Sequence, residues 1–200
     1  MSGLYDGSLT REQFMFLEMR RVAALAEQGL TNEEILRRVY DENLFQYPTQ
    51  REIKSKCRAC LKRLDRIRLM PNIMNALADG LAAEGKQAAL IALMLQNRLA
   101  AEFMVGVIGE KYQTLDYSLT RKDMNVFFMR LAEQDEGVAG WSEQTIKKIQ
   151  GVLRRCLVET GYLNDIRSEV LNPVLLSMEM ENDLRENGLK VLLPAFNILD

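Results

Sequence analysis

The side chains best suited to a binding chemistry are the cations of residues 51–68. This segment holds eight Lys or Arg residues and two acidic ones, a local charge of +6, in a chain of 200 residues whose net charge is −2. Four cations recur at every fourth position, with Arg51 beside them: Lys54, Arg58, Lys62 and Arg66. On a helix that rises 1.5 Å per residue, neighbours in this row lie about 6 Å apart. Such a row can contact successive phosphates of a nucleic-acid backbone.

The apolar residues of the same segment predict that it is a helix. They recur at spacings of three and four, so they share the face opposite the cations: Ile53, Cys57, Cys60, Leu61, Leu64 and Ile67. Thr49 is a suitable N-cap, with Glu52 three residues further on. We expect the cations to bind phosphates, and Gln50, Arg51 and Ser55 near the helix start to reach base edges.

Two helices are predicted before the basic one. Periodic apolar residues indicate a first helix over residues 10–28, including Leu17, and a second over residues 32–44, capped by Thr31. A short turn at residues 46–48 then leads into the basic segment. Three helices in about sixty residues, the last two joined by a tight turn, predict a helix-turn-helix unit whose recognition helix is residues 49–68.

The second half of the chain resembles the first. Leu119-Thr120 opens a predicted helix as Leu30-Thr31 does, and residues 142–147 match residues 49–54 at an offset of 93. This similarity indicates a duplication and a second, weaker nucleic-acid-binding unit. Its basic residues are Lys147, Lys148, Arg154 and Arg155. Residues 162–163 and 169–173 would supply the short hairpin of a winged helix.

Residues 87–112 form the longest apolar-rich periodic stretch and predict a central helix packed on several sides. Gly106 and Gly109 would kink this helix or admit a close neighbour. The apolar tail, residues 189–199, must pack on the rest of the protein. The predicted fold is all-α: a helical bundle with two helix-turn-helix-like units around the central helix, and at most a small β-wing near the C-terminus. The expected domains are residues 1–70, 71–115 and 116–200.

The composition argues against an enzyme. The chain has no histidine, the commonest general base and a frequent zinc ligand. Cys57 and Cys60 form a C-x-x-C pair, but a structural zinc site needs four ligands and Cys156 is the only other cysteine. Residues 80–87 match a phosphate-binding loop except at its last position, where Gln87 replaces Ser or Thr. We therefore expect no catalytic residue, no metal and no cofactor.

The chain is also expected to be cytoplasmic and not to enter a membrane. Its longest uninterrupted apolar run has eight residues, and a membrane-spanning helix needs about 20. The N-terminus shows no basic segment followed by an apolar one, so no secretory signal is predicted.

Several segments carry a resemblance to a known family. They are the apolar residues 88–112 with the sequence Glu102-Phe-Met-Val, and Trp141-Ser-x-x-Thr145-Ile-Lys-Lys running into Glu159-Thr-Gly-Tyr-Leu. With the length and helical pattern, they resemble the BrxA family of bacteriophage exclusion (BREX) systems over the whole chain. The resemblance implies a non-enzymatic phage-defence protein that binds double-stranded DNA and acts beside a methyltransferase, an ATPase and other BREX proteins. The family is also likened to NusB-type RNA-binding proteins.

Three functions remain open from the sequence. The first is binding of double-stranded DNA, and the second is binding of RNA, which shares the same electrostatics. In the third, a protein-interaction scaffold, the basic face docks an acidic partner and the apolar tail supplies a second interface. The resemblance assigns no residue to nucleic acid, so the candidate site rests on the charge pattern alone. The sequence does not determine the oligomeric state.

Overall fold

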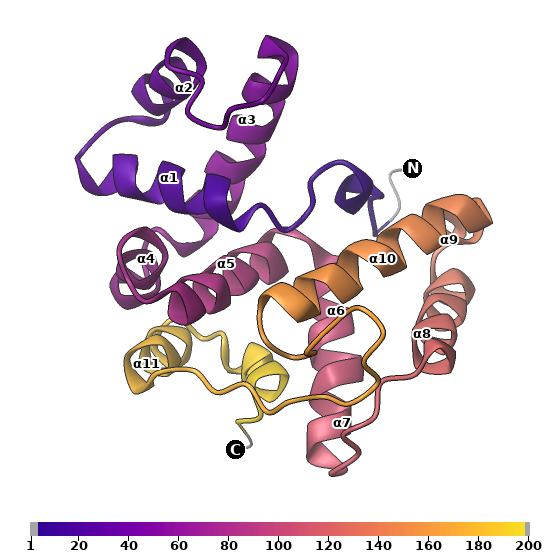
Figure 1. Ribbon diagram of the computed structural model, residues 1–200. Coiled ribbons are helices and arrows are strands. Elements are labelled where there is room, and N and C mark those ends of the chain that lie inside the picture. Colours follow the sequence, from indigo (N-terminus) through magenta and orange to yellow (C-terminus); the bar gives the residue numbers. More distant parts are fainter. Residues whose placement is uncertain (1–3, 199–200) are drawn as a thin grey trace.

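A computed structural model describes residues 4–198, which fold as eleven α-helices with short 3-10 and π-helical segments (Figure 1). The α-helices are α1 (Phe16–Glu27), α2 (Asn32–Asp41), α3 (Gln50–Ile67), α4 (Pro71–Ala78), α5 (Ala82–Gln96), α6 (Arg98–Phe103), α7 (Glu110–Gln113), α8 (Arg121–Gln134), α9 (Glu136–Ala139), α10 (Glu143–Glu159) and α11 (Met178–Glu186). The others are the 3-10 helices η1 (Ser8–Thr10) and η3 (Lys190–Phe196) and the π-helix η2 (Met104–Gly109). The predicted all-α class is confirmed.

The N-terminal three-helix unit, α1 to α3, differs from the predicted one at two points. The helix expected from residue 10 begins at Phe16, because Met15 before it has a left-handed backbone conformation (φ 57°). The buried stripe of α1 is therefore Phe16, Met19, Val22, Ala23 and Leu25, and Leu17 is 65% exposed. The residues between α2 and α3, 42–49, are too many for the three- or four-residue turn of a helix-turn-helix.

The predicted apolar face of α3 is confirmed. All six of its apolar side chains are buried, and the Thr49 hydroxyl accepts a hydrogen bond from the Glu52 amide, 3.3 Å away. This face packs on α1, α2 and α5, which fixes the opposite side of α3 toward solvent. Apolar periodicity and an N-cap were enough to predict this helix and its buried face, because both depend on residues only a few positions apart.

The predicted central helix is broken. Asn97 is extended (φ −124°, ψ 108°), and the helices before and after it, Ala82–Gln96 and Arg98–Gln113, are bent by 115°. The Asn97 side chain accepts from the Ala100 amide (3.0 Å) and so caps α6, and it donates to Asp6 and Ser8. Gly109 does not kink the chain but admits η3, since a Cβ there would lie 3.0 Å from Pro194.

The C-terminal half begins with an N-cap like that of α2. Thr120 and Asp123 form a capping box at α8, as Thr31 and Glu34 do at α2. The predicted β-wing is not formed as strands in residues 4–198. Residues 117–119 and 169–171 pair instead, through Leu119 N to Glu169 O (2.7 Å) and Leu171 N to Tyr117 O (2.9 Å), which leaves one isolated bridge.

The apolar tail packs as expected over the residues that the structure describes, which exclude 199 and 200. Leu192, Leu193 and Phe196 of η3 are buried against η2, and the Tyr162 hydroxyl donates to Ala195 O (2.9 Å). In residues 4–198 no single helix is long and apolar enough to cross a membrane; α5 and the following helix reach that length only as the pair bent at Asn97.

Candidate nucleic-acid interface

The four cations of the predicted row, Lys54, Arg58, Lys62 and Arg66, all lie on the exposed side of α3. At the two ends of the row the cations have neighbours. The Lys54 ammonium lies 4.1 Å from the centre of the Tyr40 ring, and Arg66 Nε donates to Gln96 Oε1 (2.9 Å). Arg58 and Lys62, in the middle, have no hydrogen-bond or ion-pair partner within the described chain. Their charges are free to bind an external anion.

The start of α3 presents the three residues expected to reach base edges. Arg51 and Ser55 are exposed. Gln50 is held by α2, because its Oε1 accepts a hydrogen bond from the Tyr40 hydroxyl. Tyr40 thus contacts both Gln50 and Lys54 and fixes the first turn of α3 against α2.

Three other cations of the segment have partners within the protein, and only Arg63 among them is buried. Arg63 is only 1% exposed, and its guanidinium donates to Phe14 O (2.8 Å) and Glu12 O (2.6 Å). Lys56 donates to Arg11 O, and Arg68 pairs with Asp65 (3.0 Å). The position of Arg63 carried a signal: it lies three residues after Cys60 and four before Ile67, on the apolar face.

The second predicted group, on α10, does not form a comparable row. Lys148 and Arg155 are exposed, and Lys147 pairs with Glu143 one turn earlier (3.4 Å). Arg154 is half-buried and donates from Nε to Ile166 O (3.1 Å) and from its Nη2 to Ser168 O (2.6 Å). Its side chain therefore holds residues 166–168 against α10. Figure 1 shows α10 in a different part of the molecule from α3.

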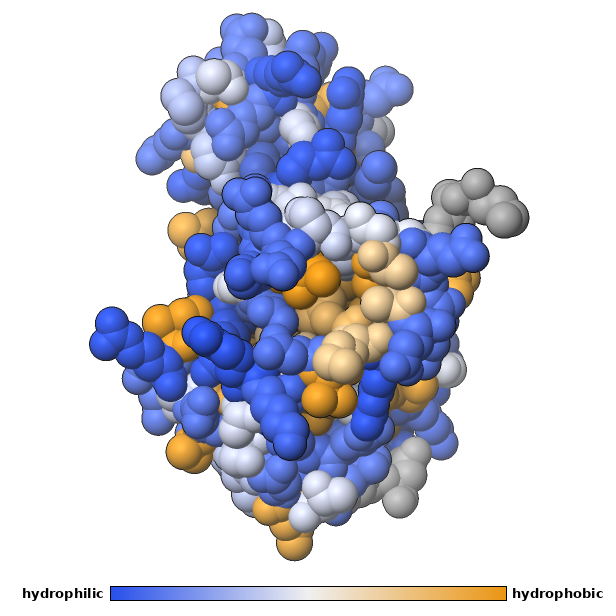
Figure 2. Space-filling view, turned by 90° about the vertical axis from the view of Figure 1, so that its right-hand side faces the viewer, coloured by the Kyte–Doolittle hydropathy of each residue, from blue (hydrophilic) through white to orange (hydrophobic). Residues whose placement is uncertain are grey.

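The surface around α3 is hydrophilic. In Figure 2 the upper part of the molecule, which contains the N-terminal three-helix unit, shows few hydrophobic residues, whereas hydrophobic residues gather in a hollow lower on the same side. A surface that carries cations and little apolar area suits a polyanion better than an apolar protein partner.

The cysteines are placed as small core residues. Cys57, Cys60 and Cys156 are all buried and free. Residues 4–198 contain no group of three or more Cys, Asp or Glu side chains arranged to hold a metal ion. Residues 80–81 form the turn before α5, and Gly85 lies inside α5, packed against Phe16. The segment that resembled a phosphate-binding loop is therefore the turn between α4 and α5 together with the first turns of α5.

The thiols are predicted to be unreactive in the folded protein. Burial raises the pKa of Cys57 to about 11 and the pKa values of Cys60 and Cys156 still further, so the thiolate needed for alkylation is scarce at pH 8. We expect mass spectrometry to find no modification after iodoacetamide treatment of the native protein, and three modified cysteines after treatment in about 8 M urea. Fast native alkylation of the Cys57–Cys60 pair would contradict the core assignment.

The fold and the exposed basic helix define an all-α protein with a local cationic surface. Within that class the chain belongs to the BrxA family, whose model matches residues 3–188. It is 32% identical to the BREX protein BrxA of Bacillus cereus (strain H3081.97) over 190 residues, which cover 92% of each chain. It is 25% identical to the BREX protein BrxA of Paramagnetospirillum magneticum over 171 residues, covering 86% of this chain and 85% of the relative.

A solved structure shares the fold. The crystal structure of an uncharacterized protein from Magnetospirillum magneticum matches with a TM-score of 0.80 and 23% identity, over 96% of this chain and 97% of that chain. The two proteins therefore share the same overall fold over nearly the whole length of both chains.

Proposed function

We propose that this protein is a non-enzymatic, cytoplasmic component of a BREX phage-defence system that binds double-stranded DNA through the exposed face of α3. Membership of the BrxA family, and relatives named BREX protein BrxA, support the BREX role and imply other BREX proteins as partners. The observation that carries DNA binding is the row of four exposed cations on a helix whose other face is fixed in the core.

The row of cations acts on the phosphates. Arg58 and Lys62 supply the two unpartnered charges at its centre, and Lys54, Arg66 and Arg51 extend it in both directions. Because the other face of α3 is packed in the core, the helix backbone is already ordered, and binding mainly restricts the rotamers of the cations. Arg51 and Ser55 are the exposed residues that reach base edges, and Gln50 contributes through its Nε2, since its Oε1 already accepts from the Tyr40 hydroxyl. On α10, Lys147, Lys148 and Arg155 add weaker contacts to the phosphates. Arg154 assists them by holding the adjoining loop through its hydrogen bonds to Ile166 O and Ser168 O.

Two alternatives are less well supported. An RNA duplex presents the same phosphates but a deep, narrow major groove that side chains do not enter, so the proposed base reading from the start of α3 fits DNA better. A docking scaffold that uses the apolar tail is disfavoured because Leu192, Leu193 and Phe196 are already buried. The hydrophilic surface of the N-terminal three-helix unit also offers little apolar area for a protein partner (Figure 2).

Fluorescence anisotropy tests the proposal directly. The purified protein is titrated against double-stranded DNA, single-stranded DNA and double-stranded RNA of matched length at about 50 to 300 mM salt. Five or six phosphate contacts predict a slope of about −5 in a plot of log affinity against log salt. Preferred binding of duplex DNA with this slope supports the proposal. Tighter binding of duplex RNA would show that the protein is an RNA-binding one instead. No binding of any of the three nucleic acids at low salt would reject both DNA binding and RNA binding.

A further inference from the structure

A second site is suggested by a pocket between α8, α10 and the loop that follows α10. Its volume is about 850 Å³, within the range of about 300 to 1,000 Å³ that small-molecule sites occupy. Met124 and Ile146 give it an apolar floor, and Gln150 Nε2 donates to Asn125 Oδ1 (3.0 Å) across it, from α10 to α8. Nothing in the α3 interface involves this pocket.

Gly151 is the unexpected residue of the pocket. It lies in the middle of α10 and lines the pocket, although glycine destabilises a helix interior relative to alanine. Its backbone is not left-handed, and a Cβ built on it would meet no atom within 4 Å. Neither backbone geometry nor close packing within the fold therefore requires glycine at this position. Its structural effect is to leave the pocket open.

The charged residues of the pocket favour an anion of low charge. Four cations and two carboxylates line it, a net charge of +2: Arg121, Lys147, Arg154, Arg167, Glu143 and Glu169. Arg154 is occupied by the carbonyls of the loop, and Lys147 by Glu143. Arg121 and Arg167 are exposed, and within residues 4–198 their guanidinium groups have no hydrogen-bond or ion-pair partner. A phosphate monoester carries a charge of about −1.5 to −2 at pH 7, which this lining complements.

We propose that this pocket binds a single nucleotide monophosphate. The base lies against Met124, Ile146 and the backbone of Gly151, which no side chain covers, and its polar edge faces the Asn125–Gln150 pair. The phosphate binds Arg121 and Arg167. The nucleotide is either a free ligand or the unpaired end of a nucleic-acid strand, since both present the same base and phosphate.

The proposal is tested with a substitution that fills the pocket without weakening α10. Leucine at position 151 would project into the pocket, and it is a better helix former than glycine, so Gly151→Leu is expected to keep or raise the melting temperature. Isothermal titration calorimetry measures binding of the four deoxynucleoside monophosphates, the matching nucleosides and inorganic phosphate. A duplex with a three-nucleotide single-stranded overhang is compared with a blunt duplex.

The wild-type protein is expected to bind at least one monophosphate, or the overhang duplex more tightly than the blunt one, with a loss of at least tenfold in Gly151→Leu. Binding of free monophosphates indicates a small ligand, and binding of the overhang alone indicates a strand end. Equal affinity for inorganic phosphate, unchanged affinity in Gly151→Leu, or no binding of any nucleotide would overturn the proposal. The α3 variant Arg58→Glu/Lys62→Glu separates the two sites, because it should lose duplex binding and still bind the nucleotide.

Discussion

The Arg58→Glu/Lys62→Glu variant is expected to bind duplex DNA at least about 100-fold more weakly than the wild-type protein at about 0.1 M salt, a loss of about 2.8 kcal/mol. These two side chains are exposed at the centre of the row on α3 and have no partner within the described residues. The substitution removes two phosphate contacts and places two carboxylates against the backbone. Anisotropy should also show the salt slope falling by about 2, from about −5 to about −3.

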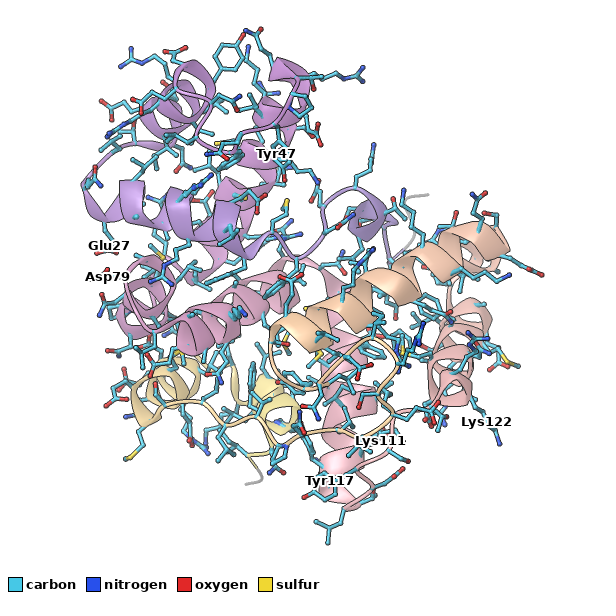
Figure 3. All side chains as sticks on the ribbon, in the orientation of Figure 1. Glu27, Tyr47, Asp79, Lys111, Tyr117 and Lys122 are labelled. Carbon is cyan, nitrogen blue, oxygen red and sulfur yellow. The ribbon has the colours of Figure 1, made fainter. Side chains whose placement is uncertain are left out.

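The matched control reverses the same number of charges elsewhere. Lys122 at the start of α8 (Figure 3) and Lys190 at the start of η3 are both exposed and lie outside the N-terminal three-helix unit. Each reversal changes the charge by −2, so both double variants take the chain from −2 to −6. Circular dichroism and thermal melting check the fold. If Arg58→Glu/Lys62→Glu binds as tightly as Lys122→Glu/Lys190→Glu, binding depends on net charge and the α3 interface is wrong.

The Arg63→Ala variant is expected to lose about 3–5 kcal/mol of unfolding free energy, the largest stability change that we predict. Arg63 extends from α3 to the segment that precedes α1, where its guanidinium binds the carbonyls of Phe14 and Glu12. Alanine leaves the buried carbonyl of Phe14 and the part-buried carbonyl of Glu12 without this donor, at about 1–3 kcal/mol for a buried acceptor, and opens a cavity. Phe14 also precedes Met15, whose backbone is left-handed, so the variant loses the contact that fixes the chain next to that residue.

Urea unfolding followed by circular dichroism measures this loss. Arg66→Ala is the control, because Arg66 is exposed on the same helix and its removal should change the free energy by less than about 0.5 kcal/mol. Burial lowers the pKa of the Arg63 guanidinium, and its Nε has no hydrogen-bond partner in the described structure, so the charged group itself is costly to bury. Arg63→Met therefore separates the packing of the side chain from its hydrogen bonds. The difference in unfolding free energy between Arg63→Ala and Arg63→Met measures the packing, and the loss that remains in Arg63→Met measures the missing hydrogen bonds. A loss below about 1 kcal/mol in Arg63→Ala would show that the carbonyls find other partners.

The candidate interface was largely predictable from the sequence because it lies on one helix. The four-residue spacing of Lys54, Arg58, Lys62 and Arg66 determines that they share a face, whatever the rest of the chain does. The group on α10 was less predictable. Arg154 is a cation like those of α3, but its hydrogen bonds go to the carbonyls of residues 166 and 168 in the loop that follows α10. The nucleotide pocket was missed because α8, α10 and that loop form it together.

The all-α class, the two faces of α3 and the helix starts at Thr31, Thr49 and Thr120 could all be predicted from the sequence, since helical periodicity and capping act over three or four residues. The position of the break in the central stretch and the acceptors that bind the buried Arg63 depended on tertiary contacts. At Asn97 the side chain bonds to η1 and to the start of α6, and at Arg63 the acceptors are carbonyls some fifty residues away. Such choices depend on partners distant in the chain, which local patterns do not encode.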